Sequence, residues 1–321
     1  MSLEITKTRE VYKPFQYPQA YNYWEQQFNA HWSPFEVSMA SDVYDWEYNL
    51  TEGERQVIGQ ILKSFIQSEV HVEDYWTQRV SKWFPKPEIQ MMASMFGAME
   101  SVHIVAYSYL NDSLGLDNYS AFLEDETAVA KLDRLKNIPI KTNKDKAKSL
   151  ALFSAITEGV NLFSSFAILM NLSRFNLLKG LQNIIQWSQA DEALHSKGGI
   201  WLFNQMVEED PTLLDDDMKK DILEAFRVAI ELEDNFIDNA FSLGEVRGLK
   251  PEYIKAFNRE RANLKLNELG LPTNWKNINQ DHIAEMEWFS LNDSTFTDFF
   301  AGKPVDYKKS GWTTEDFFPP E

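Results

Sequence analysis

The 321-residue chain contains no cysteine, which excludes disulfides, zinc–thiolate sites, iron–sulfur clusters and cysteine nucleophiles. Basic residues are also scarce, because 31 Lys and Arg stand against 49 Asp and Glu and leave a net charge of −18. Binding to nucleic acid or to an anionic membrane needs a basic surface, so we expect neither. Any chemistry must therefore come from carboxylates, imidazoles, phenols, indoles, hydroxyls or bound cofactors.

The sequence also lacks a long hydrophobic run. Its first residues, MSLEITKTREVYKPF, hold no apolar stretch of signal-peptide length, and the most apolar segment, 161–172, is too short to span a bilayer. Hydrophobic residues still make up 44% of the chain and aromatic residues 14%, which excludes a largely disordered protein. We expect a soluble, cytoplasmic protein with a large core.

Glycine (13) and proline (12) are sparse. The long segments between them carry the start and stop signals of helices. Strand signals are missing, since no period-two runs are joined by Asn-Gly or Asp-Gly turns. The predicted fold class is all-α, a large helical bundle over residues 1–298 with an N-terminal extension. Residues 299–321 are rich in Gly, Pro, charges and aromatics, which suits a flexible tail. The predicted helices cover 52–84, 88–114, 145–175, 177–207, 212–243 and 251–268.

Two of the five histidines have a glutamate three residues earlier, in Glu100-Ser-Val-His103 and Glu192-Ala-Leu-His195. Positions i and i+3 share a helix face, so both side chains of each motif can reach one metal ion. The pair alone is weak evidence, but each motif lies in an apolar helix, and two more helices carry a glutamate in the similar settings SFIQSEVHV and FSAITEGVNLF. The resulting order on four helices matches the ligand pattern of dinuclear carboxylate bundles. The six candidate ligands are Glu69, Glu100, His103, Glu158, Glu192 and His195.

Metal ions would give these carboxylates a physical reason to be buried. Four buried carboxylates repel one another and are costly to remove from water, and two divalent cations reverse both effects. Oxygen ligands with two imidazoles suit iron or manganese. The alternative is a set of glutamates paired with Lys or Arg at helix contacts, but few basic residues lie near them in sequence. Tyr107 follows His103 by one turn on nearly the same face, where a metal pair could oxidise its phenol, although simple packing also explains it.

With these motifs the sequence resembles a known family, the radical-generating small (R2, beta) subunit of class I ribonucleotide reductase. The resemblance covers essentially the whole chain and rests, in family order, on Glu100-x-x-His103-x-x-x-Tyr107, Glu158 and Asp191-Glu192-Ala-Leu-His195. It implies a ferritin-like bundle with additional helices and a Mn/Mn, Mn/Fe or Fe/Fe centre activated by oxygen or superoxide. It also implies that the small subunit of a ribonucleoside-diphosphate reductase passes the oxidant to a large (alpha) subunit, which reduces ribonucleotides to deoxyribonucleotides. The lack of cysteine fits, because that reduction needs thiols which this chain does not have.

The resemblance further implies a radical-transfer route and partners. Trp32 matches the tryptophan near the start of family members, and Asp191 matches the acid that links it to the metal-bound histidine, here His103. Tyr307 matches the tail tyrosine that relays the radical between subunits. The final residues, TTEDFFPPE, resemble the tail that docks on the large subunit, and family members form homodimers.

Two departures from the family bear on where the oxidant rests. Most members have Asp as the first ligand, and Glu69 in its place resembles branches that use manganese, alone or with iron. Three bulky apolar residues surround a stable tyrosyl radical in the family, whereas the matching positions here are Leu162, Phe166 and the small, polar Ser188. Two hypotheses stay open: a radical on Tyr107, or an oxidant on a high-valent manganese-containing cluster with Tyr107 as a bystander.

Two other functions compete with the small-subunit reading. An R2-like ligand-binding oxidase shares the bundle and the ligands but needs no relay or docking tail, so Trp32, Asp191 and Tyr307 argue against it. A ferritin-type storage protein or a plain helical scaffold is the second alternative. Storage proteins of this kind are usually much shorter and form cages, so size in solution would separate them.

Overall fold

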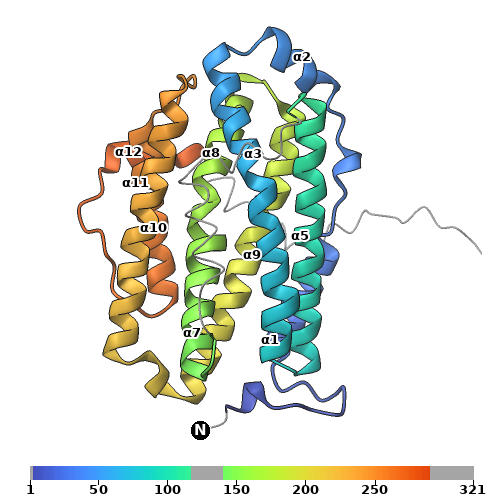
Figure 1. The fold of residues 1–321 in the computed structure, drawn as a ribbon, viewed down its shortest axis with the longest axis vertical. Helices are drawn as coiled ribbons and strands as arrows, with labels where there is room; N and C mark the ends of the chain where they lie inside the picture. The colour runs from blue at the N-terminus through green and yellow to red at the C-terminus, as the bar shows by residue number, and fades with distance from the viewer. Residues whose placement is uncertain (1–2, 117–139, 290–321) are drawn as a thin grey trace, which may run out of the picture.

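A computed structural model describes residues 3–116 and 140–289, which form an upright bundle of long helices (Figure 1). Within these ranges no strand forms, and the one isolated β-bridge joins Val246 and Leu249. The all-α prediction is therefore confirmed. In chain order the segments are η1 (Glu4–Thr6), α1 (Pro18–Asn29), η2 (Pro34–Glu36), α2 (Ala40–Tyr48), α3 (Glu52–Asp74), η3 (Tyr75–Val80), α4 (Ser81–Trp83), α5 (Pro87–Ser113), α7 (Asn143–Leu152), η5 (Phe153–Asn161), α8 (Phe163–Asn171), η6 (Leu172–Phe175), α9 (Lys179–Glu209), η7 (Pro211–Leu214), α10 (Asp216–Ser242), α11 (Pro251–Glu268) and α12 (Gln280–Ala284).

The long helices begin where the sequence signals predict. Thr51 and Glu54 form a capping box at the start of α3, with the Glu54 amide donating to Thr51 Oγ1 at 3.2 Å and the Thr51 amide to Glu54 Oε2 at 2.9 Å. Proline occupies the first turn of α5 and of α11, where its missing N–H costs nothing. All six predicted helical segments are confirmed as helical, but α1, α2 and α12 were not predicted.

Two apolar clusters fill the bundle, one toward the α8 end and one toward the α7 end (Figure 1). Helix α3 contributes Ile61 and Phe65 to the first cluster and Val72 to the second, and α5 and α9 pass between the clusters in the same way. The buried glutamates of the candidate site lie at or near these crossing points, for example Glu69 between Phe65 and Val72. The fold therefore places the polar site at mid-height, closed off by apolar packing on both sides.

Two segments are π-helical, namely η3 and η5. The sequence did not predict this change of helix type, which is frequent at functional sites. Segment η5 continues α7 and leads into α8, so 143–175 is one long apolar helical stretch. This stretch is long and apolar enough to span a membrane, whereas the segment 161–172 alone was expected to be too short. However, 89% of its most apolar 18 residues are buried inside the bundle.

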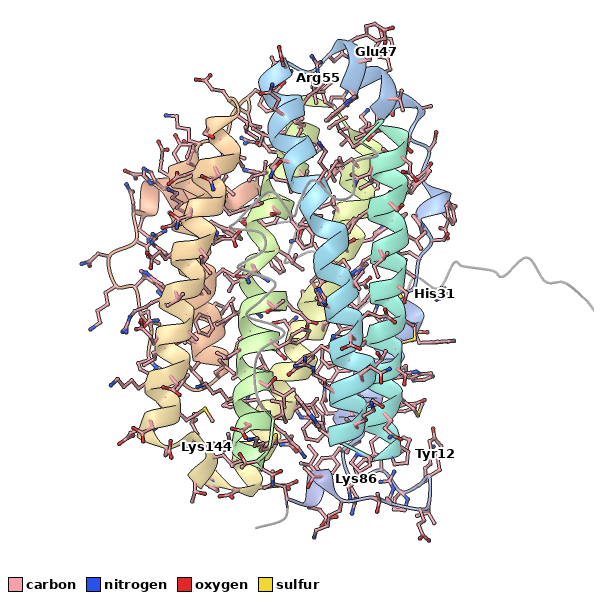
Figure 2. All side chains as sticks on the ribbon, viewed as in Figure 1. Tyr12, His31, Glu47, Arg55, Lys86 and Lys144 are labelled. Atoms are coloured by element: carbon pink, nitrogen blue, oxygen red, sulfur yellow. The ribbon has the colours of Figure 1, made fainter. Side chains whose placement is uncertain are left out.

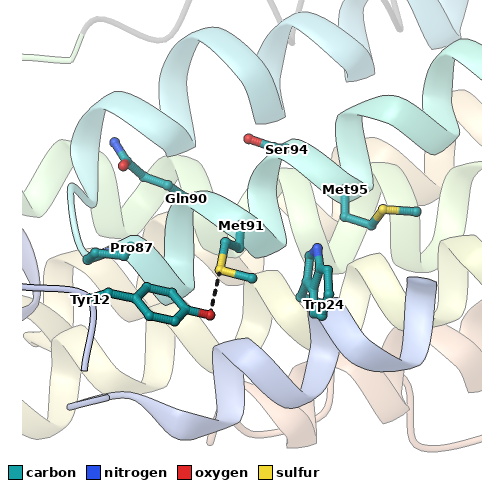
Figure 3. Close-up of a pocket in the computed structure, with 7 residues that line it drawn as sticks. All are labelled: Tyr12, Trp24, Pro87, Gln90, Met91, Ser94 and Met95. Carbon is teal, nitrogen blue, oxygen red and sulfur yellow. Dashed lines mark hydrogen bonds between the residues drawn. The ribbon is translucent and has the colours of Figure 1, made fainter. Parts of the chain in front are cut away.

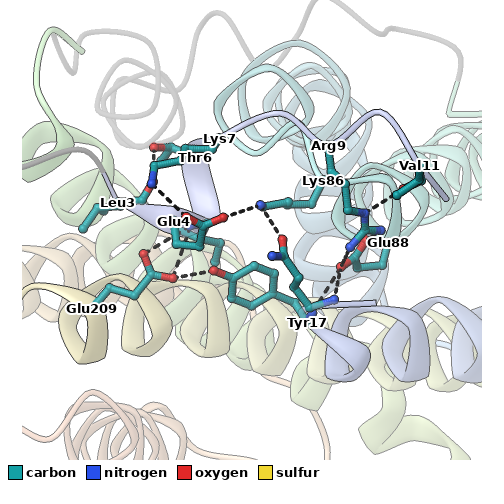
Figure 4. Close-up of polar contacts among 12 residues, drawn as sticks. Leu3, Glu4, Thr6, Lys7, Arg9, Val11, Tyr17, Lys86, Glu88 and Glu209 are labelled. Atoms are coloured by element: carbon teal, nitrogen blue, oxygen red, sulfur yellow. Dashed lines mark hydrogen bonds and ion pairs between the residues drawn. The ribbon is translucent and has the colours of Figure 1, made fainter. Parts of the chain in front are cut away.

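The N-terminal segment closes one end of the bundle (Figure 4). Glu209 at the end of α9 accepts hydrogen bonds from the Ile5 amide at 3.1 Å and from the Tyr17 hydroxyl at 2.5 Å. The buried Lys86 pairs with Glu4 at 2.9 Å. Lys86 and Lys144 both lie at this lower end of the molecule (Figure 2). These contacts fix the segment that leads into α1.

The predicted boundary between residues 298 and 299, Tyr307 and the TTEDFFPPE motif lie outside the described residues.

Candidate metal centre

Four helical elements meet at the buried site. All six candidate ligands have no exposed surface, and they come from α3, α5, η5 and α9. His103 Nδ1 lies 3.0 Å from Glu100 Oε2 and 3.1 Å from Glu192 Oε1. His195 Nδ1 lies 2.6 Å from Glu100 Oε1 and 4.0 Å from Glu192 Oε2. The two Glu-x-x-His motifs, 92 positions apart in sequence, therefore face each other across the bundle axis.

The ligand atoms fall into two overlapping groups. Glu69, Glu100, His103 and Glu192 offer atoms that all lie within 4.8 Å of one another, and so do Glu100, Glu158, Glu192 and His195. Glu100 and Glu192 belong to both groups. The geometry thus provides two adjacent positions, each with three carboxylates and one imidazole, that share two carboxylates.

The electrostatics of the cluster call for added positive charge. Burial and then the charges of Glu192 and Glu100 hold the pKa of Glu69 well above 4.5, and burial with the same two neighbours does so for Glu158. Burial and the charge of Glu100 raise the pKa of Glu192 to about 7. Burial also opposes ionisation of Glu100, but His195 and hydrogen bonds from both histidines lower its pKa to about 2. Without cations the cluster can keep only part of its carboxylates ionised.

Several polar atoms of the site have no hydrogen-bond partner, although they are fully buried. They include both oxygens of Glu69 and one oxygen of Glu158. No Lys or Arg within the described ranges forms an ion pair with any of the four glutamates, so the alternative of paired glutamates at helix contacts is wrong. Buried carboxylates without partners fit divalent cations, and this set of oxygen and imidazole donors suits iron or manganese.

The outer nitrogens of both histidines are held by neighbours. His103 Nε2 lies 3.1 Å from Asp191 Oδ2, and the Trp32 indole donates to the same oxygen at 2.8 Å. His195 Nε2 lies 3.2 Å from Gln27 Oε1, and Gln27 Nε2 donates to Asp191 Oδ1 at 2.6 Å. With Nε2 as donor to these partners, each ring can give up its Nδ1 proton and offer the Nδ1 lone pair to a metal ion held among the carboxylates. The network brings Trp32, Asp191 and His103 together.

Sequence reasoning missed two residues of this network. Gln27 comes from α1, a helix that was not predicted, and one glutamine among surface-type residues gives no local signal. Trp76 of η3 donates its indole N–H to Glu158 Oε1 at 2.7 Å. Each of the two widened helical turns thus contributes one partner of this hydrogen bond, because Glu158 lies on η5.

Tyr107 lies beside the cluster and is fully buried. Its ring centroid is 6.1 Å from that of His103 and 4.9 Å from that of Phe65. Its hydroxyl has no hydrogen-bond partner among the described residues, and burial holds its pKa well above 10. Ser188 acts in the opposite direction on this pKa, while its own hydroxyl donates to the Ile184 carbonyl oxygen at 3.1 Å. Leu162 and Phe166 belong to the same apolar cluster as Tyr107.

Comparison with known proteins agrees with this geometry. The family described as "Ribonucleotide reductase, small chain" matches residues 9–281. A probable ribonucleoside-diphosphate reductase small subunit of Invertebrate iridescent virus 3 is 35% identical, over 97% of this chain and 87% of that protein. Two solved structures share the fold. A putative class I ribonucleotide reductase from Bacillus halodurans has a TM-score of 0.77 and 21% identity, over 86% of this chain and 99% of its own. Dimanganese(II)-NrdF from Streptococcus sanguinis has a TM-score of 0.75 and 17% identity, over 87% of this chain and 99% of its own.

Proposed function

Because the chain belongs to the ribonucleotide reductase small-chain family, a family of oxidoreductase subunits, we propose that its buried cluster holds two iron or manganese ions and makes the oxidant used by the large subunit. The observation that carries this proposal is the pair of overlapping ligand groups that share Glu100 and Glu192. When bound and activated by oxygen or superoxide, such a metal pair supplies a strong one-electron oxidant. Glu69 and His103 would complete the first position, and Glu158 and His195 the second.

Trp32, Asp191 and His103 are the proposed start of the radical-transfer route. The Trp32 indole reaches Asp191 at 2.8 Å, and Asp191 reaches the His103 ring at 3.1 Å. The Trp32 and His103 rings also stack, with centroids 5.9 Å apart. Asp191 can accept the indole proton while an electron leaves Trp32. This hydrogen-bonded chain therefore supports coupled transfer of the proton and the electron. Tyr307 would continue the route at the subunit interface.

The resting place of the oxidant has two candidates, Tyr107 and the metal pair. Glu69 and Ser188 depart from the family pattern, and both departures favour the metal pair as the place where the oxidant rests. A buried phenol must lose its proton on oxidation, and burial holds the pKa of Tyr107 well above 10. This favours the metal pair as well. Replacing Tyr107 with Phe separates the candidates, because total loss of activity would contradict a bystander role.

We further propose a homodimer that forms through the outer face of α5. Between Glu88 and Asp112, the only carboxylate, imidazole, Lys or Arg side chains of α5 are those of Glu100 and His103, and both are buried. The exposed positions are Gln90, Ser94, Ala98, Ser101 and Val105. In a chain with a net charge of −18, two copies can meet closely only where such a neutral face excludes like-charge repulsion.

A groove borders this neutral face near the N-terminal end of α5 (Figure 3). It has a volume of about 490 Å³, and Tyr12, Trp24, Met91 and Met95 are among the side chains that line it. Aromatic residues and methionine are enriched in protein interfaces, which supports this end of α5 as part of the contact. We also propose a cytoplasmic location, in keeping with the burial of the one apolar helical stretch within residues 3–116 and 140–289 that is long enough to span a membrane.

The direct test of the proposed function is a reductase assay with the large subunit. The full-length protein is compared with a chain truncated before Tyr307, and metal content is measured on both. We expect reductase activity to vanish in the truncated chain while its metal content stays unchanged. Retained activity would refute the role of the tail, and an inactive full-length protein with full metal content would refute the function itself.

A further inference from the structure

The turn that carries Glu158 needs support from outside its own helix. Glu158 lies in η5, where the chain is wound as a π-helix before it returns to α-helix at Phe163. Hydrogen bonding in a π-helix runs over five residues instead of four, so a carbonyl group loses its regular donor where the winding changes back. Gly159, the residue after Glu158, lies close to this change.

Arg261 of α11 supplies a donor at this place. Its Nε donates to the Gly159 carbonyl oxygen at 2.5 Å. Its guanidinium lies over the ring of Phe163, with Cζ 3.1 Å from the ring centroid. Arg261 thus contacts both sides of the change in winding, and it is only 6% exposed.

Gly159 makes this close approach possible. A Cβ atom at this position would lie 3.0 Å from Ser196 Oγ of α9 and 3.1 Å from two carbons of the Lys265 side chain of α11. Both neighbouring helices therefore press against the backbone of the turn itself. Among the described residues, Trp76 makes the one hydrogen bond to the Glu158 side chain, so the position of the second Glu158 oxygen depends on how firmly this backbone is held.

We propose that Arg261 is a positioning residue which, through the Gly159 carbonyl, holds Glu158 where the second metal ion binds. This inference rests on the proposed dinuclear site and deepens it. The first position does not include Glu158, so Arg261 acts on the second position alone. Because Nε is the atom that meets the carbonyl oxygen, another side chain with a donor at that place should preserve the effect.

Two substitutions of nearly equal length separate the hydrogen bond from the charge. Arg261→Met places a methyl group where Nε lies, and Arg261→Gln places an amide nitrogen there. Gln can still donate to the Gly159 carbonyl oxygen, although it has lost the guanidinium. Arg259→Met is the matched control, since Arg259 lies on the same helix but pairs with Asp234 of α10 and does not contact η5.

The experiment measures Mn(II) binding to the full chain without oxygen, by metal analysis and EPR, together with hydrogen–deuterium exchange of 153–162. We expect two Mn(II) ions per chain in the wild type, in Arg261→Gln and in Arg259→Met. In Arg261→Met, affinity at the second position should fall about 10–100-fold. Exchange should then rise within 153–162 and not across the whole bundle.

The outcomes separate this inference from the function on which it rests. Wild-type affinity at both positions in Arg261→Met would overturn the role of Arg261 alone. Loss of the second ion in Arg261→Gln would also overturn it, and this variant decides the matter even if Arg261→Met does not fold. A wild type that binds fewer than two ions would overturn the proposed dinuclear site and this inference with it.

Discussion

At the residue scale, the site depends on which nitrogen of each histidine faces the carboxylates. Asp191 contacts Nε2 of His103, and Gln27 contacts Nε2 of His195. Gln27 also donates a hydrogen bond to Asp191. One glutamine from α1 therefore links the outer contacts of both rings. Such outer partners orient metal ligands and raise their basicity.

Trp32→Phe should separate radical transfer from metal binding. Phe keeps an aromatic ring over His103 but loses the N–H group that donates to Asp191. We expect metal content close to that of the wild type and reductase activity with the large subunit at background level. Metal analysis and the reductase assay on the same sample check this. Wild-type activity in this variant would rule out Trp32 as a relay.

Single residues were predictable where the sequence repeats a local motif. The two Glu-x-x-His motifs, and Glu69 and Glu158 in apolar helices, could be found because ligands on a helix must recur at fixed spacing. Gln27 and Trp76 could not be found, because their roles exist only through partners 164 and 82 positions away. The resemblance identifies Ser188 as a small, polar residue near Tyr107, but it could not predict that the Ser188 hydroxyl donates to the Ile184 carbonyl oxygen of its own helix.

At the element scale, α9 depends on a cap from another helix. Its N-cap residue, Leu178, has a positive φ of 50° and provides no side-chain cap. Instead the buried Asp42 of α2 accepts from the amides of Gly180 at 3.0 Å and Leu181 at 2.7 Å. A Cβ atom on Gly180 would lie 3.0 Å from the Asp42 carboxylate, so glycine makes room for this cap.

Asp42→Ala should destabilise the bundle by about 1–2 kcal/mol, because it removes this cap from α9. Asp42→Asn is the matched control, since its remaining carbonyl oxygen can still accept a hydrogen bond from one of the two amides. Urea denaturation of the metal-free protein, followed by circular dichroism, measures both changes. An Asp42→Ala variant as stable as the wild type would show that the amides find other partners.

Helices were predictable where capping signals and apolar periodicity agree. Both signals are present in α3, from the Thr51 capping box to its apolar spacing. Helices α1, α2 and α12 are short or carry mixed polar and aromatic residues, and tertiary contacts such as those of Asp42 and Gln27 stabilise them. The π-helical winding of η3 and η5 was missed because it changes the hydrogen-bond pattern and not the composition.

At the scale of the whole molecule, the neutral face of α5 lets us predict how substitutions affect the proposed dimer. Ser101→Glu places a charge in the middle of that face and should convert a dimer to a monomer, because two copies would bring like charges together. Asn235→Glu adds the same charge at an exposed position of α10, at the opposite edge of the bundle (Figure 1), and should leave the dimer intact. Sedimentation analysis checks both variants. A Ser101→Glu protein that remains dimeric would show that the interface does not lie on this face of α5.

The metal-free protein should lose stability as pH rises above about 5. Burial and neighbouring carboxylates raise the pKa of Glu69 and Glu158 well above 4.5 and that of Glu192 to about 7. The folded protein therefore binds more protons than the unfolded chain in this window, and this contribution fades with increasing pH. Below 4.5 the sign reverses, because hydrogen bonds from Arg247 to Glu54 and from Arg9 to Glu88 outweigh burial and lower the pKa of both carboxyl groups.

Thermal unfolding at a series of pH values, with and without Mn(II), measures this dependence. The metal-bound form should not lose stability over the same rise, since ligand carboxylates are already ionised. Equal pH profiles for the two forms would argue that the ions bind elsewhere.

The central claim is that two adjacent metal ions share Glu100 and Glu192. Low-temperature EPR of the Mn(II)-loaded protein, with metal content assayed on the same sample, tests it most directly. We predict two Mn(II) ions per chain and the spectrum of a magnetically coupled pair, which Glu100→Ala abolishes. A six-line spectrum of isolated Mn(II) at one ion per chain, unchanged in Glu100→Ala, would contradict it.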